Sequence, residues 1–126
     1  MSTLKFDPSS LSIIVNAGIK ALHPTTARLV IDTGASLVVL PWRLATAIGI
    51  KIDPKHTVET TTATAVETVP QVIIPEIKVL GKSVKNVEAI IKDLPSESHV
   101  DGLLGLSFLK NFKLTIDFNN GYLTLE

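Results

Sequence analysis

The sequence predicts an all-β domain that contains one or two short helices. Val, Ile and Thr are abundant, and turn-forming residues recur at short intervals between apolar stretches. β-Branched residues favour strands, and closely spaced turn residues indicate short connections between them. No linker, low-complexity tract or internal repeat interrupts the sequence, so we interpret residues 1–126 as a single domain.

Nine strands are expected from these apolar stretches. The last two form a hairpin, because Asn120-Gly121 suits a tight turn with positive φ angles. On this hairpin Ile116, Phe118, Leu123 and Leu125 alternate and should form one buried face. The expected strands lie at residues 11–15, 27–31, 37–40, 58–62, 66–74, 77–80, 84–91, 114–118 and 122–125.

Two short helices are expected among the strands. The first begins after Pro41, which suits a first helical turn, and ends before Gly49. The second covers residues 106–112, with Leu109 and Phe112 facing inward.

Composition excludes several classes of function. Twelve basic and twelve acidic residues cancel, so we expect neither a nucleic-acid partner nor an acidic membrane surface. Cysteine is absent, which excludes disulfides, thiolate metal sites and cysteine nucleophiles. No apolar run approaches the roughly 20 residues of a membrane helix, and residues 1–10 lack the apolar stretch of a secretory signal. We therefore expect a cytoplasmic location.

Residues 27–40 hold the most informative motif. An apolar strand leads into Asp32-Thr33-Gly34-Ala35, and a second apolar strand follows. The apolar flanks hold such a turn firmly, and Gly34 permits a bend and a close approach that a Cβ would block. From the triplet alone two interpretations stay open: a carboxylate presented for chemistry, or a structural turn in which Asp32 satisfies backbone amides.

A second segment, residues 99–109, places Leu103-Leu104-Gly105 directly before the second helix. Together the two motifs resemble the retropepsin-like (retroviral-type, clan AA) aspartic peptidases of the bacterial and cellular type. Members of that family pair an Asp-Thr/Ser-Gly turn with a later apolar-apolar-Gly element. The resemblance covers nearly the whole sequence in the right order.

The resemblance implies a closed β-barrel or sandwich with a flap hairpin near residues 57–72. It implies that Asp32 is the catalytic carboxylate and that Thr33 bonds across to a partner chain. Gly34 would line the substrate channel. The residues that would support the active-site turn are Thr33, Gly34, Ala35, Leu103, Leu104 and Gly105, and those of the flap that would contact substrate are Thr61, Thr62, Ala63 and Thr64. Family flaps are usually glycine-rich or aromatic, whereas residues 57–70 are neither.

The implied chemistry requires two carboxylates. Peptide hydrolysis needs a base that activates water and an acid that protonates the departing nitrogen. Two carboxylates held close together share one proton and supply both. The sequence contains one Asp-Thr-Gly, so we expect a homodimer that acts on peptide or protein substrates and needs no cofactor or metal.

Two other functions are considered. A retropepsin-fold dimer could bind extended peptides without cleaving them. An actin-like ATPase also presents an Asp-x-Gly turn after a strand, but its two-lobed nucleotide cleft needs more than 126 residues. Asp101 lacks the Thr-Gly that follows a catalytic Asp, and we expect it to cap its own turn instead. Ser36 has no apparent His partner, and the three histidines lack metal-ligand spacing.

Overall fold

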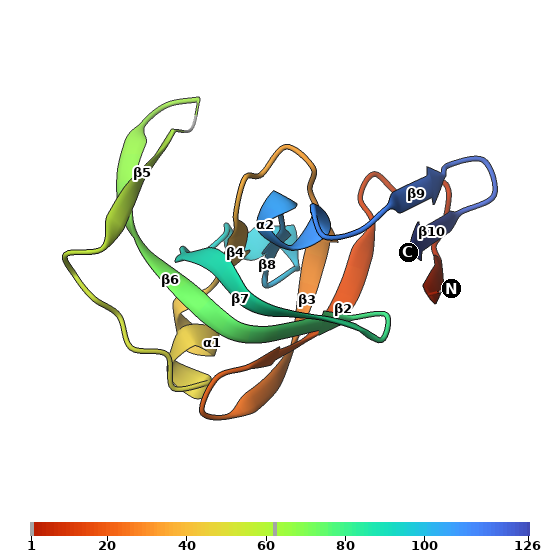
Figure 1. Cartoon of the computed structure of the whole chain (residues 1–126). Coiled ribbons are helices and arrows are strands. Elements are labelled where there is room, and N and C mark those ends of the chain that lie inside the picture. Colours follow the sequence, from red (N-terminus) through yellow and green to blue (C-terminus); the bar gives the residue numbers. More distant parts are fainter. Residues whose placement is uncertain (1, 62) are drawn as a thin grey trace.

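The computed structural model describes residues 2–61 and 63–126. It is built mostly of strands, with two short α-helices and one 3-10 helix, as Figure 1 shows. In chain order the elements are β1 (Ser2–Lys5), β2 (Ile14–Lys20), β3 (Pro24–Ile31), β4 (Val38–Leu40), α1 (Trp42–Ala47), β5 (Thr57–Thr61), β6 (Val66–Val79), β7 (Lys82–Ile91), η1 (Ser96–Ser98), β8 (Gly102–Leu104), α2 (Leu106–Leu109), β9 (Leu114–Asp117) and β10 (Tyr122–Leu125).

Six strands close into a barrel. Their order is β2-β3-β8-β4-β7-β6, and a further pairing of β2 with β6 joins the two ends. The β3–β8 and β4–β7 pairs are parallel, and the β2–β3 and β6–β7 pairs are antiparallel. The predicted all-β closed barrel with short helices is therefore confirmed.

The hairpin of β5 and β6 projects from the barrel. β5 pairs with the first part of β6, whereas the second part of β6 belongs to the barrel wall. Figure 1 shows the hairpin rising away from the barrel at the left of the view. A hairpin thus lies where the family resemblance placed a flap.

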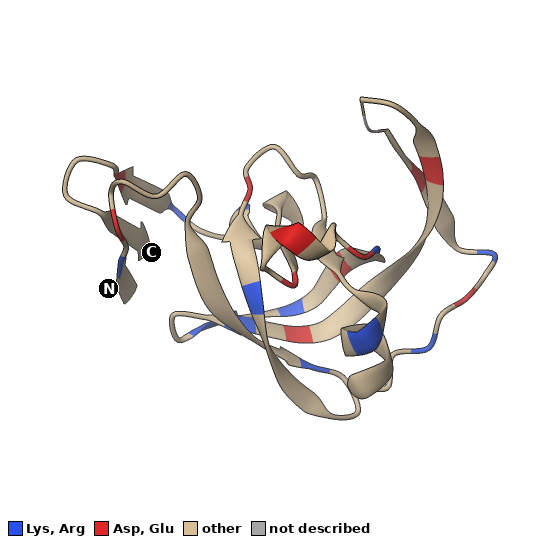
Figure 2. Ribbon diagram, turned by 180° about the vertical axis from the view of Figure 1, so that it is seen from behind, with Lys and Arg blue, Asp and Glu red and all other residues tan. Residues whose placement is uncertain are grey.

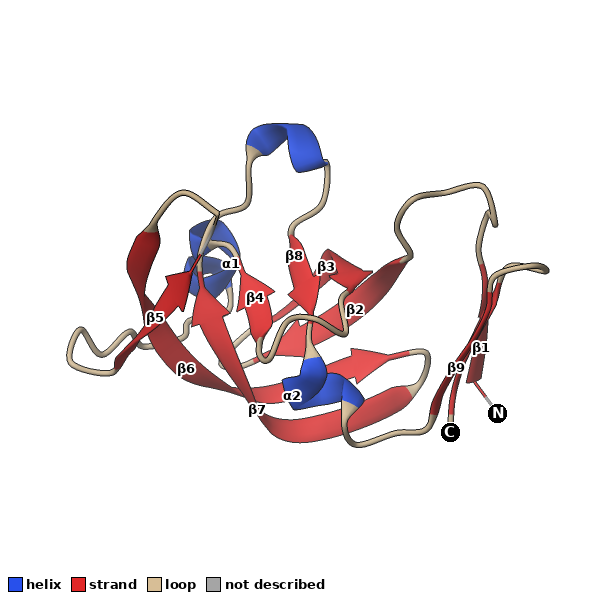
Figure 3. Cartoon of the chain, turned by 90° about the horizontal axis from the view of Figure 1, so that it is seen from above, coloured by secondary structure: helices blue, strands red, loops and turns tan. Residues whose placement is uncertain are grey.

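The two ends of the chain form a separate three-stranded sheet in the order β1-β10-β9. Figure 3 shows this sheet beside the barrel, with the two termini close together. Leu123 and Leu125 are fully buried, as predicted, but Phe118 is 66% exposed and meets Phe6 edge-on. The expectation that Phe118 belongs to the buried face is wrong, because β9 ends at Asp117 and Phe118 already lies in the turn.

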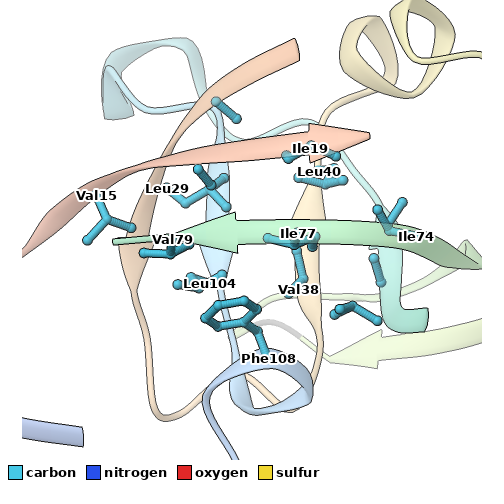
Figure 4. Close-up of a cluster of buried hydrophobic side chains, with 14 of the residues drawn as sticks. Val15, Ile19, Leu29, Val38, Leu40, Ile74, Ile77, Val79, Leu104 and Phe108 are labelled. Carbon is cyan, nitrogen blue, oxygen red and sulfur yellow. The ribbon is translucent and has the colours of Figure 1, made fainter. Parts of the chain in front are cut away.

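Inward-facing side chains from all six barrel strands fill the core. Phe108 of α2 closes one end of it, packed among strand residues. A smaller cluster of Val39, Val69 and Ile90 lies between the barrel and the hairpin. Figure 4 shows the main core, with Val15, Ile19, Leu29, Val38, Leu40, Ile74, Ile77, Val79, Leu104 and Phe108 labelled.

The strand boundaries differ from the predicted ones in two informative places. β2 begins at Ile14 rather than at residue 11, and Leu11 is fully exposed. β6 runs without a break through Pro75, where the sequence predicted two strands. The β6–β7 register pairs Ile74 with Val87 and Glu76 with Lys85 and skips Pro75 and Asn86, and Asn86 has a φ of 56°. The ladder thus passes this point without needing the N–H that proline lacks.

Three short elements differ from the prediction as well. β1 and β8, of four and three residues, were not predicted as strands. The second helix ends at Leu109 rather than at residue 112. In the last turn Gly121 has a positive φ of 76°, whereas Asn120 does not, because the loop has four residues instead of two.

Charged residues of both signs are spread over the strands and loops, as Figure 2 shows. Within the described residues, no helix is long and apolar enough to cross a membrane.

Candidate active site

The Asp32 turn follows β3 directly and is fixed by its backbone. The Asp32 N–H donates to the Leu104 carbonyl at 3.1 Å, and the Ala35 N–H donates to the Asp32 carbonyl at 3.2 Å. The Gly34 N–H donates to Asp32 Oδ1 at 2.9 Å. Among the described residues Oδ2 of Asp32 has no hydrogen-bond partner. One carboxylate oxygen is thus held in place while the other remains available.

Access to this turn is open. Asp32 is half-buried, whereas Thr33 and Gly34 are exposed. A Cβ on Gly34 would lie 3.2 Å from Asp32 Oδ1, so a side chain there would press on the carboxylate. The geometry is consistent with both interpretations of the Asp32-Thr33-Gly34 triplet. One oxygen of Asp32 accepts a backbone N–H, as in a structural turn, and the other is unpaired by the described residues, as a carboxylate available for chemistry would be.

The second motif packs against the first. β8 runs parallel to β3, with Leu104 beside Ile31, and Leu104 is fully buried. A Cβ on Gly105 would lie 2.4 Å from the Leu37 carbonyl oxygen and 2.7 Å from that of Ala35. This glycine therefore allows the chain to pass close to the turn, and the structure brings 32–35 and 103–105 together.

Ser107, which was not among the site residues predicted from the sequence, links the same region. Its hydroxyl accepts from the Val38 N–H at 2.9 Å and donates to the Glu88 carbonyl at 2.7 Å. The side chain is buried and links α2, β4 and β7. In the sequence Ser107 is the single polar residue of the apolar run 106–109, and this pattern indicates a hydroxyl that faces inward and forms hydrogen bonds there.

Gly102 was also missed. A Cβ at this position would lie 1.8 Å from the Val39 carbonyl oxygen, so β8 and β4 can be neighbours only with glycine here. In the sequence Gly102 reads as an ordinary turn residue after Asp101.

Asp101 lies at the opposite end of β8 from the Asp32 turn. Its Oδ2 accepts the Arg28 N–H at 2.8 Å, and its Oδ1 pairs with the Arg43 guanidinium. Both carboxylate oxygens are engaged, so Asp101 links β3 to α1. The role of capping its own turn, considered from the sequence, does not describe these contacts.

A cavity of about 500 Å³ lies between the Asp32 turn and the hairpin. It begins at Ala35, three residues after Asp32, and Leu103 and Thr61 also line it. Ala63 and Thr64 are exposed at the hairpin tip and do not line it, and Thr62 lies outside the described residues. Of the four hairpin residues expected to contact substrate, Thr61 is the one placed on the cavity.

A larger hollow of about 660 Å³ lies elsewhere, beside α1 and η1. Trp42, Arg43, His99 and Asp101 line it, and none of the predicted site residues does. The smaller cavity beside Asp32 is therefore the better candidate for a substrate cleft.

Comparison with known proteins agrees with this geometry. A family model described as aspartyl protease matches residues 14–108, which include both motifs. Among solved structures, the crystal structure of a retropepsin-like aspartic protease from Rickettsia conorii superimposes with a TM-score of 0.69 at 24% sequence identity. The match covers 98% of this chain and 87% of that one, and at this identity the likeness concerns the fold. No curated protein matches the sequence.

Proposed function

Because the chain belongs to the aspartyl protease family and has the retropepsin-like fold, we propose that it is an aspartic endopeptidase. Two Asp32 carboxylates, one from each subunit of a homodimer, would hydrolyse peptide bonds of extended polypeptides. The observation that carries the proposal is the Asp32 turn, whose backbone is fixed while one carboxylate oxygen is unengaged by the described residues.

The dimer follows from the chemistry. Within the sequence there is one Asp-Thr-Gly, and the other candidate, Asp101, has both oxygens engaged. A second carboxylate at the site would come from a two-fold mate. The exposed Thr33 and Gly34 and the 41% exposed Leu106 are available for such a contact.

The reaction is a general acid–base hydrolysis. Two neighbouring carboxylates share one proton, because placing two negative charges together is unfavourable. The ionised carboxylate takes a proton from water as the oxygen attacks the peptide carbonyl carbon. The protonated one gives its proton to the departing nitrogen as the C–N bond breaks, which leaves a carboxylic acid and an amine.

The roles of the surrounding residues follow from their positions. The Gly34 N–H orients one oxygen of Asp32. Leu103, Leu104 and Gly105 pack against the turn through the β3–β8 pair and support it. The cavity beside the turn would receive a substrate side chain while the β5–β6 hairpin covers the peptide as a flap.

Mixing normal and Asp32→Asn subunits tests the shared site. The amide is close in size to the carboxylate and can still accept from Gly34, so fold and dimerisation should persist while cleavage is lost. In an equal mixture after subunit exchange, activity should fall to about a quarter of that of the same total amount of normal protein. Cleavage of an unfolded protein, followed by mass spectrometry, is the readout.

Activity that tracks the mole fraction of normal subunits, with exchange shown to be complete, would contradict the shared site. Binding of peptides by the normal protein without any cleavage would contradict the proposed peptidase activity and would support a dimer that binds extended peptides without cleaving them.

A further inference from the structure

The cavity beside the Asp32 turn has apolar walls and a polar corner. The residues of its walls are Leu37, Val39, Val58, Ile90, Leu94 and Leu103. Ser36, Glu59 and Thr61 also line it, but Glu59 and Thr61 flank Thr60 on β5, so their side chains point to the opposite, exposed face of that strand. The corner is formed where the end of β7 faces the β5–β6 hairpin, and Lys92 and Thr60 lie there. A cavity of this kind favours a ligand group that is apolar along its length and polar at its end.

Lys92 is held at this corner by its backbone and its charge. Its N–H donates to the Leu40 carbonyl at 2.9 Å, directly after β7 ends. Its ammonium lies 3.1 Å from Glu67 Oε2 on β6, and the side chain is only 24% exposed. An ammonium has three N–H donors, and among the described residues Glu67 is its one partner. Two donors are therefore left for another acceptor.

Glu67 is the more exposed member of this pair. Its side chain is 51% exposed and lies on the projecting hairpin. An incoming acceptor can therefore take its place beside Lys92, because the Glu67 carboxylate can turn to solvent at small cost.

Thr60 gives an independent indication at the same corner. It lies directly across the β5–β6 ladder from Glu67, so the two side chains share one face of the hairpin. Its hydroxyl oxygen is buried and has no partner in the part of the chain that the structure describes. Buried hydroxyls are normally hydrogen-bonded, so a bound group that supplies a partner would be stabilised here.

We infer that this corner selects a substrate side chain with an apolar stem and an oxygen acceptor at its end, that of Glu or Gln. The stem would pack on the apolar walls, and the terminal oxygen would accept from the Lys92 ammonium. Rotation of the Thr60 side chain about χ1 would turn its buried hydroxyl toward the same oxygen. A Lys side chain would place a second cation beside Lys92 and be disfavoured. This inference rests on the proposed peptidase function and assigns its specificity.

The test compares peptides that differ at one position. Cleavage sites in an unfolded protein first identify the position that carries the preference. Peptides with Glu, Gln, Leu or Lys there are then compared by kcat/KM, and by binding to the Asp32→Asn protein. In the normal protein we expect kcat/KM for Glu and Gln to exceed that for Lys by about tenfold and also to exceed that for Leu.

Two variants probe the corner itself. Lys92→Met keeps the apolar stem without the charge and should abolish the preference for Glu over Leu. Thr60→Val keeps the shape without the hydroxyl and should lower kcat/KM for Gln several-fold while Leu is unaffected. Lys85→Met is the matched control: Lys85 also pairs with a glutamate of β6, Glu76 at 3.2 Å, but is 68% exposed and lies outside the cavity.

The outcomes separate the two proposals. A Glu-to-Leu ratio in Lys92→Met within twofold of normal, or one that falls equally in Lys85→Met, would overturn the assignment of this subsite. Absence of cleavage by the normal protein would contradict the peptidase. The binding series on Asp32→Asn would then still support the subsite if it shows the preference, or overturn it if it does not.

Discussion

Replacing Ser107 with alanine is expected to lower the free energy of unfolding by about 2–4 kcal/mol. The Ser107 hydroxyl is the hydrogen-bond acceptor of the Val38 N–H and the donor to the Glu88 carbonyl. Alanine removes both bonds. Val38 is fully buried, so its N–H has no route to water. The buried Val38 N–H left without a partner costs about 1–3 kcal/mol, and losing the part-buried bond to the Glu88 carbonyl costs about 0.5–1.5 kcal/mol more, which together give roughly the expected range.

Urea unfolding followed by fluorescence measures this effect. Trp42, the only tryptophan of the sequence, lies on α1 and reports the transition. Protein concentration must be held constant, because a dimer unfolds at a concentration-dependent midpoint. Ser10→Ala, the same change at an exposed residue, is the control and should leave the midpoint unchanged.

A second readout connects this bond to the site. Val38 begins the strand that leaves the Asp32 turn, so losing its anchor should also reduce kcat in the proposed peptidase. A Ser107→Ala protein within about 0.5 kcal/mol of normal would refute the reasoning, since that is the range of ordinary surface substitutions.

Three further predictions follow from other contacts. Gly102→Ala should prevent folding or lower the free energy of unfolding in urea by more than about 3 kcal/mol, because its Cβ would lie 1.8 Å from the Val39 carbonyl oxygen. Gly81→Ala is the control: its Cβ meets open space but its φ is 78°, so the free energy of unfolding should fall by about 1–2 kcal/mol. Hydrogen bonds from the Asn120 side chain and then from backbone N–H groups lower the pKa of Asp117. The stability that the Asp117 carboxylate contributes is therefore present above the pKa of the unfolded state and is lost as the pH falls through the lower pKa of the folded state. The urea midpoints of the normal protein and of Asp117→Asn should accordingly differ at pH 6 and converge in strong acid. A difference between the midpoints that stays constant with pH would contradict this. Cleavage should have a bell-shaped pH profile, because fully protonated and fully ionised dyads are both inert, and a rate that stays level across the acid range would count against a shared proton.

The sequence was sufficient to find the Asp32 turn and its packing partner, because both are local patterns. Asp32-Thr33-Gly34 and Leu103-Leu104-Gly105 each keep a recognisable spacing of apolar residues and glycine. The structure places them against each other through the parallel β3–β8 pair. Their juxtaposition came from the family resemblance, since nothing in either segment alone specifies its partner.

What the sequence left hidden depends on contacts between distant segments. β8 has three residues and is a strand because it lies between β3 and β4, with Gly102 admitting the close approach. The polar role of Ser107 depends on where Val38 and Glu88 arrive. Such features have no period or local propensity to reveal them, because tertiary context decides them.

The arrangement separates chemistry from recognition within the proposed enzyme. The Asp32 turn is seated on the closed barrel, where backbone bonds and Gly105 leave little room for movement. The hairpin that carries Thr60 and Glu67 extends from β6 and meets the barrel wall at Lys92 through an ion pair. Catalytic groups need positions fixed to a fraction of an ångström, whereas a substrate-covering element must open and close. An ion pair between the half-exposed Glu67 and the 24% exposed Lys92 side chain suits that boundary, because a substrate oxygen can replace the carboxylate without leaving the ammonium unpaired.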